Sequence, residues 1–348
     1  MKRIVLFLLA AIILILAAIW IFSSFDKVEK EVLKVNRIFD KSERVALKVN
    51  RFEKELFSIN SKNVIEKSSK WDKEFGTFPE FFAVQILQIS QKDKAQYYNE
   101  LLAFTQNKDL REAYDSTALL FSDFSVIQND LELAFGQFAA DFPSYPIPEI
   151  TTFFGGFNYG VVTYDNNIAI GLENFLGENS KFYQYLRDPE YLRFQKQKRF
   201  ISSNVMEVWF NEHFQKYLGG RDLLAQIIYK GKMMYFLDKM LPELAIEDKF
   251  RFTIEQMAWV EENEASIWEY FVQEDLLFSN KESEFRSFVN YAPFAKGMPK
   301  EAPGRVAYFI GYKMVSEYME NNKIDIEELM YLTDSKDFLQ QSKYKPTK

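Results

Sequence analysis

The stretch WVEENEASIW, residues 259–268, contains the side chains best placed by type and spacing for acid–base chemistry. If it is helical, Glu261 and Glu264 lie on one face together with Met257 and Trp268, and two neighbouring carboxylates can act as general acid and general base. In the structural alternative, these carboxylates cap helix ends or pair with a lysine or arginine, as carboxylates on partly apolar faces usually do. The sequence leaves both interpretations open.

A second stretch, IIYKGKMMYF at residues 227–236, places two lysines around a glycine. An anion-binding loop needs its glycines ahead of a helix N-terminus, whereas Gly231 lies inside an apolar stripe with helical spacing. A glycine in the middle of a helix costs about 1 kcal/mol relative to alanine, so the pattern predicts close approach of another element at Gly231. Lys230 and Lys232 are then expected at the solvated edges of the stripe.

The chain of 348 residues has one histidine, His213, and no cysteine. These counts exclude disulfides, cysteine nucleophiles, thiolate metal ligands and the two-histidine H-E-x-x-H zinc motif. A serine activated by His213 would need a presenting turn such as G-x-S-x-G, which the sequence lacks. We therefore predict no catalytic residue, no metal and no cofactor.

Changes in the spacing of apolar residues along the chain predict the helices and strands that must position these side chains. Apolar residues from about 75 to 140 have helical spacing, and a proline-rich connector follows. The pattern from about 151 to 172 predicts two or three short strands with a hairpin turn at 165–167. Helical patterns return from about 200 to 348, including one over 252–278. We predict one α+β domain over 26–348, predominantly helical, with a small antiparallel or mixed sheet.

The N-terminus predicts a membrane anchor in residues 1–25. An uncharged apolar run from Ile4 to Phe22 would be about 28 Å long as a helix, close to the thickness of a bilayer core. Lys2 and Arg3 precede it and favour the cytoplasmic side, so the rest of the chain would face the periplasm of a bacterium. Cleavage of the run as a secretory signal is the alternative.

Charge is unevenly distributed along the chain. The formal net charge is −7; Lys2 and Arg3 contribute +2 and residues 26–74 contribute +3, so the remainder carries −12. A nucleic-acid partner requires a clustered basic face, which an acidic body does not offer. We predict no nucleic-acid binding. A short juxtamembrane helix at about 28–39 and a first strand at about 45–51 complete the expected elements.

Several separate blocks carry a family resemblance. They are IGLENFLGENSKFY at 170–183, DPEYLRFQ at 188–195, LLAQIIYKGKMMYFLDKMLP at 223–242, NEASIW at 263–268, APGRVAYFIGYKMV at 302–315 and SKYKP at 342–346. Their order and spacing resemble the gliding-motility lipoprotein GldB family of Bacteroidetes. The resemblance implies a cell-envelope protein required for surface gliding, in a machinery linked to type IX secretion.

The sequence departs from that family in one respect. Lipoprotein members carry a cysteine just after the signal, and this chain has none, so the apolar run rather than a lipid would hold the protein. The location then implied is the inner membrane, with the main domain in the periplasm.

The family is also distantly similar to predicted zinc metallopeptidases, in which a helix carries H-E-x-x-H and the next helix carries a glutamate before a glycine. Here Lys230 stands before Gly231 at the glutamate's place and would repel a zinc ion. The comparison implies a degenerate zincin-like domain without metal.

We therefore expect a non-catalytic envelope component that acts through contacts with other gliding or secretion proteins. The alternatives are a metal-independent envelope hydrolase using Glu261 and Glu264, or a glycan-binding module built on tyrosines and tryptophans. The structural or interaction candidates are Gly231, Lys230, Glu261, Glu264, Trp268, Gly304 and Arg305.

Overall fold

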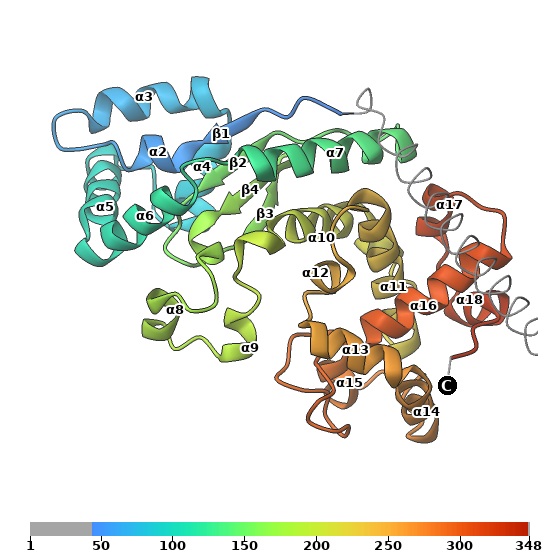
Figure 1. The fold of residues 1–348 in the computed structure, drawn as a ribbon. Coiled ribbons are helices and arrows are strands. Elements are labelled where there is room, and N and C mark those ends of the chain that lie inside the picture. The colour runs from blue at the N-terminus through green and yellow to red at the C-terminus, as the bar shows by residue number, and fades with distance from the viewer. Residues whose placement is uncertain (1–43, 347–348) are drawn as a thin grey trace, which may run out of the picture. The chain divides into compact units, whose positions relative to one another are not determined.

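The computed structural model describes residues 44–346. The predicted membrane anchor Ile4–Phe22 and the helix predicted at 28–39 lie outside these residues. Among the described residues, no helix combines the length and the apolar character needed to cross a bilayer. Residues from Val45 onward form one compact unit, shown in colour in Figure 1.

Helices dominate this unit and surround one small sheet (Figure 1). Before the sheet they are α2 (Phe52–Leu56), α3 (Val64–Phe75), α4 (Phe78–Phe81), the π-helical turn η2 (Phe82–Ile86), α5 (Lys94–Gln106), α6 (Lys108–Leu120) and α7 (Ser125–Asp141). After the sheet they are η3 (Leu172–Phe175), α8 (Lys181–Tyr185), α9 (Glu190–Arg193), η4 (Lys198–Phe200), α10 (Ile201–Phe214), η5 (Gln215–Tyr217), α11 (Leu223–Met240), α12 (Ile246–Phe250), α13 (Ile254–Glu262), α14 (Glu264–Gln273), α15 (Glu282–Val289), α16 (Val306–Asn321), α17 (Ile326–Tyr331) and α18 (Ser335–Ser342).

The sheet is mixed, with strand order β1-β2-β4-β3. Its strands are β1 (Val49–Arg51), β2 (Ile150–Phe153), β3 (Val161–Tyr164) and β4 (Asn167–Gly171). β1 and β4 both run parallel to β2, whereas β3 pairs with β4 in an antiparallel hairpin. Asp165 and Asn166 form the predicted turn with φ values of 43° and 57°, the left-handed conformation that tight hairpins require. The predicted α+β class with a small mixed sheet is confirmed.

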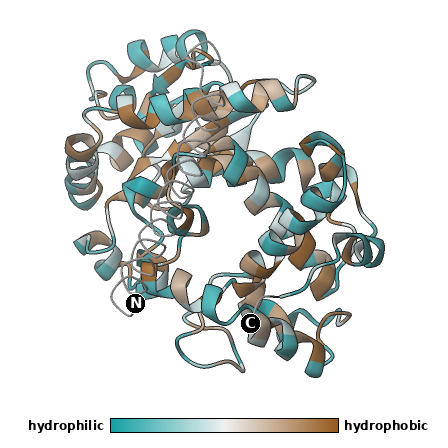
Figure 2. Cartoon of the chain, turned by 45° about the vertical axis from the view of Figure 1, so that its right-hand side comes forward, coloured by the Kyte–Doolittle hydropathy of each residue, from teal (hydrophilic) through white to brown (hydrophobic). Residues whose placement is uncertain are grey.

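Each face of the sheet packs against its own hydrophobic core. Ile168 and Ile170 of β4 belong to the larger core, which includes residues of α7, α10, α11 and α16. Ala169 points to the opposite face and belongs to the smaller core, formed largely by aromatic residues of α2 to α5. The outer helices alternate between brown and teal in Figure 2, as expected for helices with one face in a core.

The loop after β2 wraps around a buried carboxylate. Glu173 is fully buried and accepts hydrogen bonds from the backbone N–H groups of Gly155 (2.7 Å) and Phe157 (3.0 Å). Burial raises its pKa to about 7, against the opposing effect of these N–H donors. Gly155 and Gly156 belong to this carboxylate-binding turn, and Gly156 has a φ of 72°.

Helices α11 and α16 cross at a pair of glycines. A Cβ atom on Gly231 would lie 2.2 Å from the carbonyl oxygen of Gly311, and a Cβ on Gly311 would lie 2.0 Å from the carbonyl oxygen of Ile227. Neither position tolerates a side chain, so the two backbones are in direct contact. The close approach predicted at Gly231 is confirmed.

The helix predicted over 252–278 is wrong as a single element. It is divided at Asn263, which ends α13 and begins α14. The side chain of Asn263 donates to the carbonyl oxygen of Trp259 at 2.8 Å. Local hydrogen bonds of this kind from asparagine compete with the regular helical pattern. The expectation that Glu261 and Glu264 share one helical face therefore fails.

Substituting Gly231 tests the crossing. Alanine in an open mid-helix position stabilises a protein by about 1 kcal/mol relative to glycine. We expect Gly231→Ala instead to lower the free energy of unfolding by about 3 kcal/mol, because the new methyl group overlaps the backbone of Gly311. Urea unfolding followed by circular dichroism measures the difference.

Gly160→Ala is the matched control, because the nearest atom to a Cβ there is 3.7 Å away. This variant should unfold within about 1 kcal/mol of the parent. Equal stabilities of the Gly231→Ala variant and the parent would contradict the proposed backbone contact.

Candidate functional site

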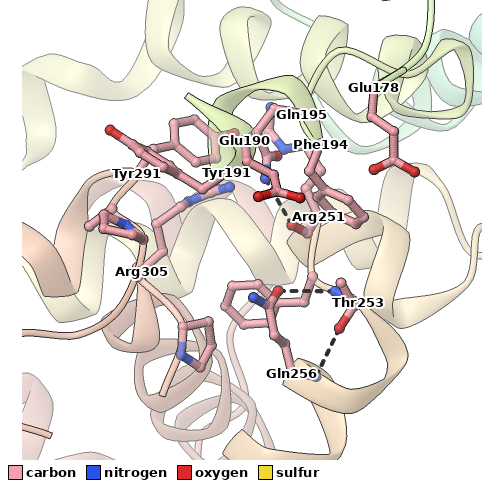
Figure 3. A pocket seen from close by; sticks show the side chains of 15 residues that line it. Glu178, Glu190, Tyr191, Phe194, Gln195, Arg251, Thr253, Gln256, Tyr291 and Arg305 are labelled. Carbon is pink, nitrogen blue, oxygen red and sulfur yellow. Dashed lines mark hydrogen bonds between the residues drawn. The ribbon is translucent and has the colours of Figure 1, made fainter. Parts of the chain in front are cut away.

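A cavity with a volume of about 460 Å³ opens where three segments meet. The segments are the α8–α9 region, the connection from α12 to α13, and the loop that leads from α15 into α16 (Figure 3). The lining residues are Glu178, Glu190, Tyr191, Phe194, Gln195, Arg251, Phe252, Thr253, Gln256, Tyr291, Ala292, Pro293, Pro303, Gly304 and Arg305. Its size is within the range typical of ligand sites.

Arg251 enters the cavity from the connection between α12 and α13. It ends α12 in the left-handed conformation, with a φ of 55°, and is only 3% exposed. Its Nη1 donates to Oδ1 of Asn204 at 2.5 Å, while its carbonyl oxygen accepts from the side chain of Gln195 at 3.3 Å. The α9 region and α10 thus hold this arginine in place. Burial lowers the pKa of Arg251 to about 10, so it remains charged at neutral pH.

Arg305 approaches from the start of α16. It also has a left-handed backbone, with a φ of 68°, and is 2% exposed. Nη1 donates to the carbonyl oxygen of Phe250 at 3.3 Å. The preceding residue, Gly304, is pressed against Ala292, whose backbone nitrogen would lie 2.7 Å from a Cβ. This close contact fixes the position from which Arg305 enters the cavity.

The two arginines share one carboxylate, that of Glu207 on α10. Nη2 of Arg251 contacts Oε2 of Glu207, and Nη2 of Arg305 lies 3.7 Å from the same oxygen. Nε and Nη2 of Arg305 nevertheless lack a hydrogen-bond partner among the described residues, whereas Arg251 also hydrogen-bonds with Tyr291. One negative charge therefore serves two buried cations, which leaves positive charge and free donors at the cavity.

Tyrosines surround this charge. The guanidinium of Arg305 lies 4.0 Å from the ring centre of Tyr308 and 4.4 Å from that of Tyr291, distances typical of cation–π contacts. Burial alone would raise the pKa of Tyr308, but the charges of Arg305, Lys230 and Arg251 lower it to about 8. The low pKa is a direct consequence of the concentrated positive charge.

The rest of the cavity differs in character. Glu178 and Glu190 are exposed residues on its α8–α9 side, and Figure 3 places Glu178 on the opposite side from Tyr291 and Arg305. Tyr191 and Phe194 add aromatic surface to the same side. The site therefore combines a buried cationic floor with an acidic and aromatic rim.

Comparison with known proteins now places the chain in a family. A family model described as gliding motility protein GldB matches residues 34–346, which is most of the chain and includes every residue of the cavity. The chain belongs to the GldB family. The expected family resemblance is thereby confirmed, and with it a role in gliding motility and in the cell envelope. No curated protein and no solved structure matches this GldB family member.

The structure separates the two carboxylates that were candidates for acid–base chemistry. Glu261 is exposed near the end of α13, whereas Glu264 is 2% exposed at the start of α14. Glu264 accepts a hydrogen bond from the hydroxyl of Tyr344 at 2.9 Å and lies 3.8 Å from Nζ of Lys313. Trp268 packs edge-on against Tyr344, with ring centres 5.4 Å apart. Neither glutamate lines the cavity, and Glu264 and Trp268 hold the C-terminal segment.

The two lysines beside Gly231 have different environments. Lys230 lies at the cationic cluster, with Nζ 5.3 Å from the ring centre of Tyr308. Lys232 was expected at a solvated edge, which is wrong: it is 2% exposed and donates to the carbonyl oxygen of Leu332. Burial lowers the pKa of Lys232 to about 7. α11 is covered on nearly all sides by other helices, so Lys232 is enclosed.

His213 lies in an aromatic environment. Its ring is 4.3 Å from that of Trp209 and 4.9 Å from that of Tyr145, and burial lowers its pKa. Among the described residues, no three histidine or acidic side chains are grouped as a metal site would require.

Sequence reasoning selected Gly304 and Arg305 but missed Glu207, Arg251 and Tyr291. Only one local signal pointed to Arg251: it stands between two aromatic residues in KFRF at 249–252, where a buried charge is unusual. Glu207 occupies an ordinary helical position, and its role arises only from packing.

Tyrosine titration tests the electrostatics of the site. We expect one phenol of the native protein to ionise near pH 8, because the neighbouring cations stabilise its phenolate. Ultraviolet difference absorbance should show this phase, Tyr308→Phe should remove it, and Lys230→Met should move it to higher pH. Identical titration curves for the parent and Tyr308→Phe in this range would show that the cations do not act on Tyr308.

Proposed function

We propose that this GldB family member is a non-catalytic component of the gliding machinery, linked to type IX secretion and acting through contacts with other proteins. The observation that carries this proposal is the family match over residues 34–346. The separation of Glu261 from Glu264 and the aromatic surroundings of His213 support a non-catalytic role. A hydrolase built on those carboxylates gains no support from the structure.

We further propose that the apolar run Ile4–Phe22 holds the protein in the inner membrane with the main domain in the periplasm. The support is the length of the run, the preceding Lys2 and Arg3, and the lack of a cysteine for lipid attachment. Contacts with partner proteins would then form at the periplasmic surface of that membrane.

We also propose that the fold is a zincin-like scaffold that has lost its metal. The support comes from the order of elements, in which two long helices, α10 and α11, follow the sheet. On these helices Glu207 and Asn204 contact Arg251 of the cavity, and Lys230 lies at the neighbouring cluster. A cation-rich cluster of this kind opposes the binding of a zinc ion.

Complementation of a deletion strain tests the non-catalytic role. Deletion of the gene should abolish gliding, and alleles carrying Glu261→Gln, Glu264→Gln or His213→Gln should restore it. Glutamine at 264 keeps an acceptor for the Tyr344 hydroxyl, so the fold is preserved. Immunoblots control for protein level, and loss of gliding by any of these alleles at normal level would oppose the proposal.

Fractionation and protease protection test the location. The protein should sediment with inner membranes at its full length, resist protease in intact cells and become sensitive in spheroplasts. A cytoplasmic protein that stays protected in spheroplasts is the control. A shortened, soluble periplasmic product would show instead that residues 4–22 act as a cleaved signal.

A further inference from the structure

The buried arginines of the cavity hold more hydrogen-bond donors than the protein itself uses. Their side chains are each 3% exposed, yet Nε and Nη2 of Arg305 lack a hydrogen-bond partner in the described part of the chain. A buried donor without a partner is unfavourable for folding. We propose that Arg251 and Arg305 bind a carboxylate group, and that this group is the C-terminus of a peptide.

Charge favours a carboxylate over a phosphate. The three side chains in direct contact, Arg251, Arg305 and Glu207, carry one net positive charge, which a single carboxylate neutralises. Lys230 adds a further positive charge nearby, beside Tyr308. The forked guanidinium groups match the two oxygens of a carboxylate. A phosphate monoester carries about −1.5 to −2 at neutral pH, and the additional charge would be repelled by Glu178 and Glu190 in the same cavity.

The rim fits the remainder of a peptide. The exposed carboxylates of Glu178 and Glu190 accept hydrogen bonds, which backbone N–H groups of a peptide supply. Phe194, Phe252 and Tyr191 provide apolar surface for a side chain near the C-terminus. A volume of about 460 Å³ is sufficient for a small group and not for a folded domain, so only the end of a chain enters.

This site is independent of the proposed motility role. The role follows from family membership, whereas the site follows from unpaired donors in one cavity. If no peptide binds, the proposed gliding role is unaffected. If the protein proves to be catalytic, the proposed binding site is unaffected.

The test uses the full-length protein in detergent and two N-acetylated random tetrapeptide libraries, one with free C-terminal carboxylates and one amidated. We expect the protein to retain acid peptides at least about tenfold more than amides, the effect of one charge-assisted hydrogen bond. Mass spectrometry of the retained peptides measures the ratio. An equal amount of inorganic phosphate should not displace the acid peptides.

Two variants change the site in opposite directions. Arg305→Lys removes the forked donor and should lower retention of acid peptides about tenfold. Glu207→Gln removes the carboxylate that competes for the arginines and should raise retention above that of the parent. Arg286→Lys, an exposed arginine of α15 outside the cavity, is the matched control and should change nothing.

Three outcomes would overturn the proposal. They are equal retention of acids and amides, displacement of the acids by equimolar phosphate, and a Glu207→Gln variant that folds but retains fewer acid peptides than the parent. Circular dichroism of each variant establishes that it is folded. The Glu207→Gln result decides the matter if Arg305→Lys does not fold.

Discussion

Direct backbone contact between α11 and α16 is the constraint on which the helical part of the structure depends. Gly231 and Gly311 let the two helices cross with no side chain between them, which brings the N-terminal end of α16 beside the middle of α11. Arg305 precedes α16 and Lys230 precedes Gly231, so the crossing also gathers their charges around Tyr308. A wider separation of the two helices would move Arg305 and Lys230 apart and would also weaken packing in the core.

Buried charge is the second organising feature, and the partners of the buried charges differ between two places in the fold. Glu173 accepts two backbone N–H groups at Oε1, while its Oε2 has no hydrogen-bond partner among the described residues, and its pKa is raised to about 7 because desolvation dominates. Arg251 and Arg305 are buried together around Glu207, and one carboxylate cannot satisfy both. Buried ion pairs contribute little net stability, so a cluster with excess positive charge is more readily explained by binding than by folding.

The contents of the cavity support the proposal that this envelope protein recognises other molecules without transforming them. The cavity holds cations, an acidic rim and aromatic surface, and Glu261, Glu264 and His213, which were weighed for catalysis, are not among its lining residues. Glu264 and Trp268 hold the C-terminal segment through Tyr344, which gives a structural reason for the SKYKP block. The family blocks thus include both packing residues and residues of the site.

The sequence by itself determined the fold class, the β3–β4 hairpin, the close contact at Gly231 and the family, because each depends on local spacing or on residue types that few conformations accept. It selected Arg305 and Gly304 as candidates without assigning them a site. Only the tertiary structure decided that Asn263 divides a helix, that Lys232 is enclosed, and that Arg251, Arg305 and Glu207 meet. The enclosure of Lys232 and the meeting of the arginines with Glu207 arise from packing between segments up to about a hundred residues apart, and such distances leave no periodicity in the sequence. The division at Asn263 depends on a local side-chain hydrogen bond that helical spacing does not reveal.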